Sequence, residues 1–550
     1  MKKVLLTAIN SQFIHSNLAV RYLKAYAKEL DLEIKIREFS INDRIERVFE
    51  EIMEEKPDMI GFSCYIWNGE YVDKLSTLIK RVDESIQIFY GGPEVSFNCE
   101  EVLLNSEGDF LIEGEGEESF KEFLKWKLEN GFDRKDLKVK GIYSKNDKNE
   151  IVYGGKREAI DMNSLVFPYN ENEDLSNKII YYEASRGCPF NCKYCLSSTI
   201  RGVRFLEPDR VKRELKFLSD KKVKIVKFVD RTFNADAKFA MEIWEYLMSL
   251  DTETVFHFEI TADIVTEEEI ELLKKAPKGR FQFEVGVQST NNEVLRNVNR
   301  YIEFKDIKEI VMRIEEGKNI NQHLDLIVGL PGENFESFRN SFNDVYSIGP
   351  EKLQIGFLKL LKGSSMREEA EKWGMSYSPY HPYEILKTKD ISFEEISKLK
   401  RVDSVVDKYH NTGKFNEIVE FMIGDFDTPF DFYYSLSEYF YKKGYFSRSI
   451  SASEYYKVFL DFNEEILKKE NNVLEEVVKF EYLKFNKKSW LPPFLTRLNV
   501  KEEEQAIKEK LRAENKFDKK MHLEKFSIDI ERYINKKEIV FKEKYYIFIV

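Results

Sequence analysis

The chain has 550 residues, more than a single hydrophobic core can organise, so about three domains are expected. It is 42% hydrophobic and 33% charged, with only 13 prolines and 25 glycines, which excludes a disordered or fibrous chain and favours an ordered, helix-rich one. The net charge of −12 argues against broad non-specific nucleic-acid binding, which requires clustered lysines and arginines, and leaves only a local patch for a structured RNA.

The lengths of the apolar stretches and the number and spacing of the cysteines indicate the cellular compartment of the protein. No apolar stretch approaches the roughly 18 residues of a membrane span, and Met1-Lys2-Lys3 leads directly into a short strand rather than a signal peptide. Five cysteines, three of them in one loop, do not form a disulfide framework. We therefore expect a cytoplasmic protein with no membrane partner.

Residues 1–135 alternate short apolar runs with helical patterns. The expected strands are residues 3–7, 33–36, 59–63, 86–90 and 110–112. Short apolar strands separated by helices predict an α/β fold with a doubly wound parallel sheet. Ligands of such sheets bind in the loops at the carboxyl ends of the strands. The unusual residues fall in these loops, at 10–17, 63–68, 91–96 and 114–119.

Residues 136–178 form a predicted linker. The pattern indicates a hairpin, with strands at 141–144 and 151–153, followed by an acidic, asparagine-rich connector at 169–177. On this interpretation the next domain begins at residue 179.

Three cysteines in ten residues are the strongest chemical signal in the chain. Cys188, Cys192 and Cys195 are spaced C-x3-C-x2-C on a loop rich in glycine, proline and asparagine. Thiolates this close can converge on one soft metal centre, usually zinc or an iron–sulfur cluster. Zinc normally takes a fourth cysteine or histidine nearby, and the next histidine is His257. Three ligands leave one coordination position open for a substrate or cofactor.

Residues 179–378 repeat a strand-then-helix rhythm. The expected strands are residues 179–183, 223–229, 255–260, 280–287, 323–328 and 352–358. In several of them apolar residues alternate with polar ones, so one face of the strand is polar. A barrel packed solid would carry aliphatic side chains on both faces, so the alternation predicts a cavity for polar ligands. The alternative, a half-solvated sheet, is disfavoured because parallel sheets are usually covered on both sides.

The cysteine spacing, the aromatic Tyr194 before the last cysteine and the β/α units that follow resemble the radical S-adenosylmethionine (radical SAM) enzymes. In that family three thiolates hold a 4Fe-4S cluster, and its fourth iron chelates the amino and carboxylate groups of SAM. One electron then cleaves a carbon–sulfur bond of SAM, which gives a 5′-deoxyadenosyl radical. The resemblance implies a partial parallel barrel over residues 179–378 and an electron donor such as flavodoxin or ferredoxin. An oxygen-labile cluster would suit an anaerobe.

The resemblance also implies the residues that contact SAM. They are Phe190, Tyr194, Asp230, Glu259, Glu284, Gln288, Arg300 and Gly329. Phe190 and Tyr194 would flank the adenine, Tyr194 mainly through its backbone, and Gly329 would lie near it. Glu259, Glu284 and Gln288 would bind the ribose and amino group. Asp230 stands where the family carries Gly-Gly-Glu, which this chain lacks. Arg300 either pairs with the SAM carboxylate or is a surface cation at a helix end.

Residues 1–135 resemble the cobalamin-binding domain of cobalamin-dependent radical SAM proteins. The residues that carry this resemblance to the cobalamin site are His15, Ser63, Gly91, Gly92, Gly114 and Gly116. The chain departs from many cobalamin proteins because it lacks their D-x-H-x-x-G motif. His15 lies in the equivalent loop, where it either ligates cobalt or caps the next helix. Many members of the resembled family are expected to bind cobalamin without a protein histidine.

Residues 379–550 lose the β/α rhythm and form a mainly helical accessory domain. The expected helices are residues 393–409, 415–422, 430–443, 449–469 and 473–485, and a strand closes the chain at 545–550. Aromatic residues at helical spacing favour a packed core over a binding surface. The segment resembles an accessory domain of uncharacterised role.

The leading prediction is a cobalamin- and SAM-dependent radical enzyme that methylates an unactivated carbon of an unknown small-molecule or peptide substrate. Two alternatives keep radical chemistry: a ring rearrangement or cyclisation with the same cofactors, and a tRNA modification such as methylthiolation. The acidic balance and the single cysteine trio count against the tRNA reaction. A third alternative is an iron–sulfur sensor without activity, which the polar inner faces of the barrel disfavour.

Overall fold

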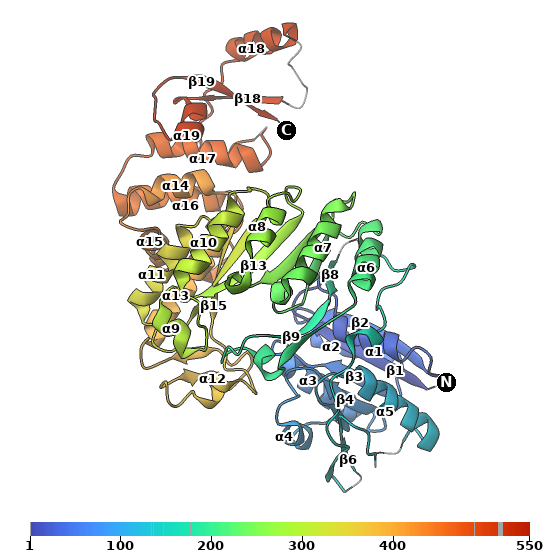
Figure 1. Cartoon of the computed structure of the whole chain (residues 1–550). Coiled ribbons are helices and arrows are strands. Elements are labelled where there is room, and N and C mark those ends of the chain that lie inside the picture. Colours follow the sequence, from blue (N-terminus) through green and yellow to red (C-terminus); the bar gives the residue numbers. More distant parts are fainter. Residues whose placement is uncertain are drawn as a thin grey trace. The chain divides into compact units, whose positions relative to one another are not determined.

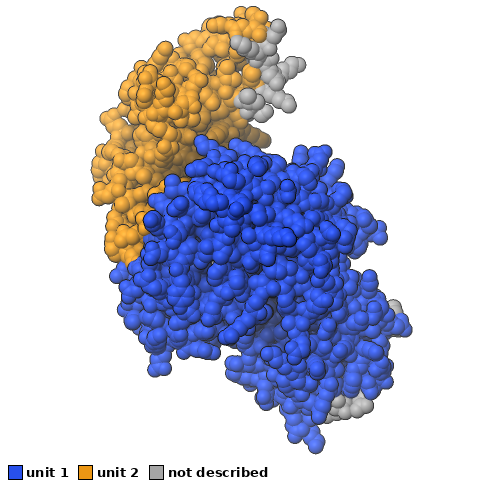
Figure 2. Space-filling view, in the orientation of Figure 1, with its two compact units in different colours: residues 1–334, 356–392 blue, residues 335–355, 393–550 orange. Residues whose placement is uncertain are grey.

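The computed structural model of the chain describes residues 2–549 except 134, 136, 147, 177, 489 and 515–520. It divides into two compact units (Figure 2): unit 1 contains residues 1–334 and 356–392, and unit 2 contains residues 335–355 and 393–550. Asp136 and Asn177, which lie at the predicted ends of the linker, fall outside the described residues.

The first sheet of unit 1 is the predicted doubly wound sheet. Its strands are β1 (Lys3–Asn10), β2 (Glu33–Ser40), β3 (Met59–Ser63), β4 (Gln87–Gly91) and β5 (Phe110–Ile112), parallel in the order β2-β1-β3-β4-β5. The predicted hairpin, β6 (Ile142–Lys145) and β7 (Ile151–Tyr153), extends this sheet beside β5.

Helices cover both faces of this sheet because its strands are apolar on both sides. They are α1 (Leu18–Tyr26), α2 (Ile45–Glu54), α3 (Gly69–Val82), α4 (Cys99–Leu104) and α5 (Glu117–Asn130). Phe89, Phe120 and Phe123 belong to one buried cluster, and Ile60, Val72 and Leu75 belong to a second. All five residues of β3 are buried, as expected for a central parallel strand.

The second sheet has six strands, as predicted. Five of them lie in unit 1 and run parallel, and β8 and β13 are labelled in Figure 1: β8 (Ile179–Tyr182), β11 (Ile225–Phe228), β12 (Val255–Ile260), β13 (Phe281–Gln288) and β14 (Asn321–Val328). The sixth is β15 (Lys352–Phe357), of which residues 352–355 belong to unit 2 and residues 356–357 to unit 1. The helices of this sheet are α6 (Pro208–Asp220), α7 (Ala237–Ser249), α8 (Glu267–Leu273), α9 (Asn292–Asn297) and α10 (Phe304–Glu315). Along β13 buried residues alternate with half-buried ones. The polar face is therefore partly shielded, which supports the cavity over the half-solvated sheet.

Two short segments complete unit 1. A hairpin of β9 (Ser185–Cys188) and β10 (Gly202–Phe205) carries the first cysteine. After β15 come α12 (Ser365–Glu368), β16 (Ser376–Tyr377) and β17 (Ile385–Lys387). None of the helices in the described part of the chain is both long and apolar enough to cross a membrane.

Unit 2 is mainly helical, as predicted. It contains α11 (Phe335–Tyr346), α13 (Phe393–Tyr409), α14 (Asn416–Ile423), α15 (Pro429–Lys442), α16 (Glu454–Phe462), α17 (Asn472–Phe485), α18 (Lys501–Ala513) and α19 (Ile530–Lys536). The predicted last strand is β19 (Lys544–Ile549), which pairs with β18 (Met521–Phe526); its predicted final residue, Val550, is outside the described range. Phe430, Phe432 and Tyr433 are at most 1% exposed, so the aromatic residues form the core.

A buried carboxylate in α17 makes the stability of unit 2 depend on pH. Burial raises the pKa of Glu481 to about 7, and its Oε1 has no hydrogen-bond partner. The folded state therefore holds this proton more tightly than the unfolded chain. The contribution of Glu481 to stability is greatest below about pH 4.5 and is lost as pH rises through 7, by about 3 kcal/mol in total. Glu481→Gln should remove this dependence.

Hydrogen–deuterium exchange of α17 in the full chain, corrected for intrinsic rates at each pH, measures this effect. We expect faster opening at pH 8 than at pH 5 in the wild type and equal opening in Glu481→Gln. Glu394→Gln, at an exposed position of α13, is the matched control and should behave as the wild type. An unchanged pH dependence in Glu481→Gln would contradict the assignment.

Candidate functional site

The cysteine loop begins at the tight β9–β10 hairpin. Gly187 has φ +106, and a Cβ there would lie 2.0 Å from the carbonyl oxygen of Gly202. Only glycine allows the two strands to approach this closely, which fixes Cys188 at the end of β9. In the turn that follows, the Cys195 N–H donates to the Cys192 carbonyl oxygen at 3.1 Å.

The three thiols share one neighbourhood. All are free and half-buried. Burial raises the pKa of Cys192; the charge of Arg300 lowers it, and Cys195 and Cys188 raise it further. Among the described residues, no three His, Cys, Asp or Glu side chains gather closely enough to hold a single metal ion. A 4Fe-4S cube takes its three thiolates on three different irons, so its ligands do not need to meet at one point.

Asp230 holds the start of the cysteine hairpin through two hydrogen bonds. Its side chain is 1% exposed, and its two oxygens accept hydrogen bonds from the Ala184 N–H at 3.0 Å and the Ser185 hydroxyl at 2.6 Å. Burial raises the pKa of Asp230 to about 7. Whether Asp230 also contacts SAM stays a prediction, because each oxygen can accept a further hydrogen bond. Its strand-end position alone did not reveal the hydrogen bonds to the cysteine hairpin.

The loop after β5 is tied to the same hairpin by ion pairs. Arg186 of β9 pairs with Glu117 at 2.5 Å and with Glu183 at 3.0 Å, and Arg204 of β10 pairs with Glu115. The acidic residues of this predicted cobalamin loop therefore position the cysteine loop. Gly114 faces open space, because a Cβ there would meet nothing within 4 Å, whereas a Cβ on Gly116 would lie 3.3 Å from Cδ2 of Leu23.

The inner face of the second sheet carries a network of charged side chains. Glu284 of β13 pairs with His257 Nε2 at 3.0 Å and with Lys227 at 3.2 Å. Burial alone would raise the pKa of Glu284, but the hydrogen bond from His257 and the charge of Lys227 lower it to about 2. Glu259, two residues beyond His257, lies 3.7 Å from Arg231. Glu284 is therefore ionised and already bonded to two side chains.

Asp325 of β14 differs from Glu284 in its protonation. Burial and the neighbouring charges of Glu284 and Glu259 raise its pKa well above the ordinary value. Its Oδ1 is shielded from solvent and has no hydrogen-bond partner. Asp325 was not among the predicted site residues, nor were Lys227, Arg231 and His257. The period-two alternation that marked the polar face was the signal that could have found Asp325 and His257.

Arg300 points inward, so its interpretation as a surface cation is wrong. Its Nη2 donates to the Gly286 carbonyl oxygen at 2.8 Å, and its Nη1 lies 3.4 Å from the Tyr194 hydroxyl. Its Nε is buried and has no hydrogen-bond partner. Nearby Gln288 ends β13 at φ +71, where the register with β14 slips by one residue. Such bulges re-aim side chains next to active sites.

The other predicted SAM residues lie around this region without an observed contact that assigns their role. Phe190 and Glu259 are half-buried. Gly329 has φ +90, and a Cβ there would lie 2.9 Å from Cγ2 of Ile385, so it allows β17 to pack against the end of β14. Their contacts with SAM stay predictions.

The first cobalamin loop joins the two sheets of unit 1. His15 forms an isolated bridge with Ile179, and its Nδ1 lies 2.6 Å from the Tyr181 hydroxyl. Burial, with the charge of Lys227, lowers the pKa of His15 and favours the neutral imidazole. The helix-cap alternative is wrong, because the side chain of Asn17 caps α1.

The loops after β3 and β4 touch one another. Gly92 has φ +112, and a Cβ there would lie 2.5 Å from the Cys64 carbonyl oxygen. Gly91 ends β4, and its carbonyl oxygen accepts from the Cys64 N–H at 2.7 Å. The Ser63 hydroxyl accepts from Asn17 at 3.2 Å. Gly92 therefore allows this close approach, and whether cobalamin uses the same loops stays a prediction.

Three family models match the chain in succession. They are the B12 binding domain at residues 4–124, the radical SAM superfamily at 182–345, and a protein of unknown function (DUF4080) at 371–548. Among curated proteins, the chain is 24% identical over 360 residues to a cobalamin-dependent radical SAM methyltransferase, TokK, from Streptomyces tokunonensis. That match covers 60% of this chain and 51% of TokK, so the chain spans about half the length of this relative.

Two solved structures share the fold. The radical SAM methyltransferase TsrM from Kitasatospora setae matches with a TM-score of 0.56 and 16% identity, over 70% of this chain and 80% of TsrM. The cobalamin-dependent SAM radical enzyme OxsB matches with a TM-score of 0.53 and 15% identity, over 94% of this chain and 75% of OxsB. At these identities the likeness concerns the fold.

Proposed function

We propose that the chain, which matches in succession the models of the B12 binding domain, the radical SAM superfamily and a protein of unknown function, is a cobalamin-dependent radical SAM methyltransferase. It would bind a 4Fe-4S cluster, SAM and cobalamin, and would methylate an unactivated carbon. The substrate would be a small molecule or a peptide. The names of TokK and TsrM, both methyltransferases, favour methylation over ring rearrangement.

The observation that carries this proposal is the arrangement of three free, half-buried thiols beside an inward-pointing arginine. The donor set fits the cluster because Cys188, Cys192 and Cys195 are soft ligands on one tight loop. Together, the bound groups would supply an electron to cleave SAM and a methyl group for transfer. The protein's part is to hold them and to exclude water.

Arg300 would bind the SAM carboxylate. Its unpartnered Nε is a buried donor beside Cys192, and a carboxylate would satisfy it with a charge-assisted hydrogen bond. Glu259 and Gln288 would contact the ribose and amino group, and Phe190, the Tyr194 backbone and Gly329 the adenine. Glu284 would contact SAM in addition to Lys227 and His257, which both bond to its Oε2.

The carboxyl ends of β1, β3, β4 and β5 would hold cobalamin. Ser63, Gly91, Gly92, Gly114 and Gly116 lie in these loops or at strand ends, where backbone can approach a flat macrocycle. His15 would be a ligand of the cobalt, because a neutral imidazole whose Nδ1 is fixed by Tyr181 keeps Nε2 for a metal. Flavodoxin or ferredoxin would donate the electron, and we propose a cytoplasmic location.

Anaerobic reconstitution with iron, sulfide and hydroxocobalamin tests the proposal. We expect about four irons per chain, a corrin absorption band, and 5′-deoxyadenosine from SAM after reduction. Isotopically labelled methyl from SAM should appear on cobalamin. A reconstituted chain with a full cluster that never cleaves SAM would instead favour the sensor and would end the enzymatic proposal.

A further inference from the structure

A cavity of ≈ 1590 Å³ lies within unit 1, outside the cysteine loop and the inner face of the barrel. One wall comes from α3, the loop after β4, and α4 of the first sheet. The other wall comes from residues 362–381, the segment that contains α12 and β16. The cavity is therefore bounded by the B12-binding part of the chain and by a segment that follows the radical SAM match and overlaps the start of the match at residues 371–548.

One carboxylate joins the two walls. Glu94, whose side chain is 7% exposed, accepts hydrogen bonds from Tyr383 at 2.6 Å and His381 at 3.0 Å and pairs with Lys362 at 2.9 Å. Burial alone would raise the pKa of Glu94, but the bonds that it accepts, first from His381, lower it. Glu94 therefore neutralises Lys362, and Glu70 pairs with Lys74, another lining residue, at 2.6 Å. One lysine or arginine among the described lining residues is left without an ion pair.

That cation is Arg367. Its guanidinium lies 4.8 Å from the ring centre of Tyr383 and 5.3 Å from that of Tyr377, and Nη1 donates to the Leu360 carbonyl oxygen at 2.9 Å. No ion pair to Arg367 is present among the residues that the structure describes. Contacts with two rings and one carbonyl oxygen fix the plane of the guanidinium and leave its other N–H groups for an anion.

Aromatic side chains line the cavity beside Arg367. Phe97 packs directly against the backbone of Gly363, where an added Cβ would lie 2.2 Å from Cδ1 of the Phe97 ring. Tyr380 is 74% exposed and also lines the cavity. An apolar or aromatic body could therefore lie against these rings while an anionic group meets Arg367.

The segment that carries Arg367 also touches the cysteine loop. The Met366 N–H donates to the Lys193 carbonyl oxygen at 2.9 Å, and the Lys193 ammonium pairs with Glu369 at 2.9 Å. Lys193 lies between Cys192 and Cys195. Met366, which bonds to the backbone of the cysteine loop, is the residue directly before Arg367. A ligand bound at Arg367 would therefore lie next to this contact with the proposed cluster loop.

We propose that this cavity binds an organic anion, a carboxylate or phosphate ester on an apolar or aromatic body, with Arg367 as its principal contact. The inference rests on the proposed function in one respect: the anion is then either the acidic group of the substrate or the phosphodiester of the cobalamin nucleotide. Both sources present the same chemistry to the guanidinium.

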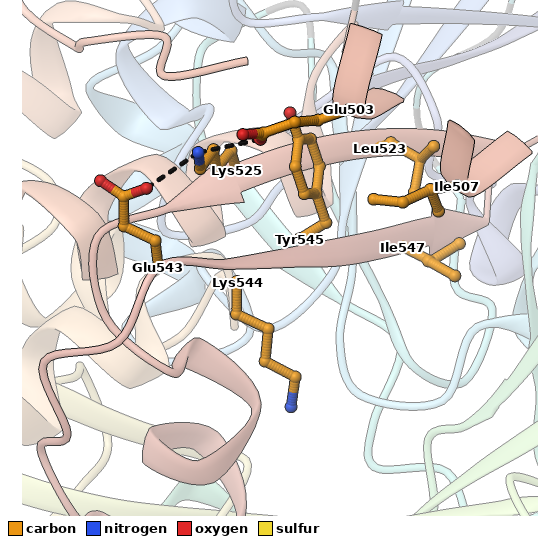
Figure 3. A pocket seen from close by; sticks show the side chains of 8 residues that line it. All are labelled: Glu503, Ile507, Leu523, Lys525, Glu543, Lys544, Tyr545 and Ile547. Atoms are coloured by element: carbon orange, nitrogen blue, oxygen red, sulfur yellow. Dashed lines mark hydrogen bonds and ion pairs between the residues drawn. The ribbon is translucent and has the colours of Figure 1, made fainter. Parts of the chain in front are cut away.

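A second cavity shows why charge is the deciding feature. It has a volume of ≈ 470 Å³ and is lined in unit 2 by residues of α18 and of the antiparallel strands β18 and β19 (Figure 3). Lys525 is held between Glu503 at 2.9 Å and Glu543 at 2.8 Å, and Lys544 pairs with Glu531 at 2.7 Å. The lysines that line this cavity are thus neutralised, unlike Arg367, and it carries no comparable proposal.

Calorimetric titration of the full chain, without cluster or SAM, tests the site with phenyl phosphate, benzoate and neutral benzamide as probes. We expect phenyl phosphate and benzoate to bind and benzamide not to bind. Arg367→Gln should weaken phenyl phosphate binding at least about tenfold, and Arg367→Lys should weaken it less. Arg401→Gln is the matched control, because Arg401 stacks on Tyr441 at 4.4 Å but pairs with Glu438 at 2.7 Å. It should bind as the wild type.

Equal affinity in Arg367→Gln, or benzamide binding as tight as that of phenyl phosphate, would overturn the inference. Displacement of phenyl phosphate by hydroxocobalamin would assign the site to the nucleotide phosphodiester. If phenyl phosphate stays bound in the presence of hydroxocobalamin, the site is assigned to the acidic group of the substrate. Because the titration uses neither the cluster nor SAM, failure of SAM cleavage would leave its result intact. The two proposals therefore fail separately.

Discussion

Cys192→Ala is expected to reduce the reconstituted iron from about four per chain to less than a tenth of that and to lower 5′-deoxyadenosine formation at least about 10³-fold. The remaining thiols, Cys188 and Cys195, can hold only two corners of a cube. Iron and sulfide analysis, together with chromatographic assay of 5′-deoxyadenosine, measures both losses on the same sample.

The matched control is Cys99→Ala. Cys99 is also a free cysteine of unit 1, is 5% exposed at the start of α4, and lies outside the cysteine loop. This variant should keep full iron and full SAM cleavage. If Cys192→Ala kept its cluster, or if Cys99→Ala lost it to the same extent, the assignment of the cysteine loop would be wrong.

The strands of the first parallel sheet follow from the sequence because burial on two faces leaves a distinctive apolar run, and several strands of the second follow from the alternation of apolar and polar residues. Residues 59–63 were expected as a strand, and β3 (Met59–Ser63) has these bounds. In unit 2, two elements are not predicted by the sequence pattern. Helix α18 has no buried residue, so it lacks the apolar stripe from which a helix is inferred. Strand β18 was missed because its partner lies 18 or more residues further along the chain.

The sequence predicts on which strand and face the site residues lie, but not which side chains they bond to. Alternation along β13 identified Glu284 on the polar face, yet its bonds to Lys227 and His257 depend on the register between three strands. The same limit applies to Asp230, whose place at a strand end was clear but whose hydrogen bonds to the cysteine hairpin were not. Side-chain direction at strand ends depends on loops that come from elsewhere in the chain.

Arg300→Gln is expected to weaken SAM binding by about 30-fold or more while iron content stays unchanged. The estimate follows from the cost of about 2–5 kcal/mol for removing one partner of a buried charge pair. Arg300→Lys should recover part of the affinity, because lysine restores the charge but not the planar fork. The change in the electron paramagnetic resonance spectrum of the reduced cluster on adding SAM provides the titration.

Arg280→Gln separates this role from a structural one. Arg280 stands just before β13 and donates only to backbone carbonyl oxygens, at 3.1 Å to Leu250 and 2.7 Å to Thr252 among others. Its loss would loosen the same strand without removing a charge from the proposed SAM site, so SAM affinity should stay within about twofold of the wild type. Arg300 also braces β13 through the Gly286 carbonyl oxygen. Equal losses of SAM affinity in both variants would therefore show that Arg300 acts through the strand, whereas a loss confined to Arg300→Gln, with partial rescue by lysine, requires direct contact with the SAM carboxylate.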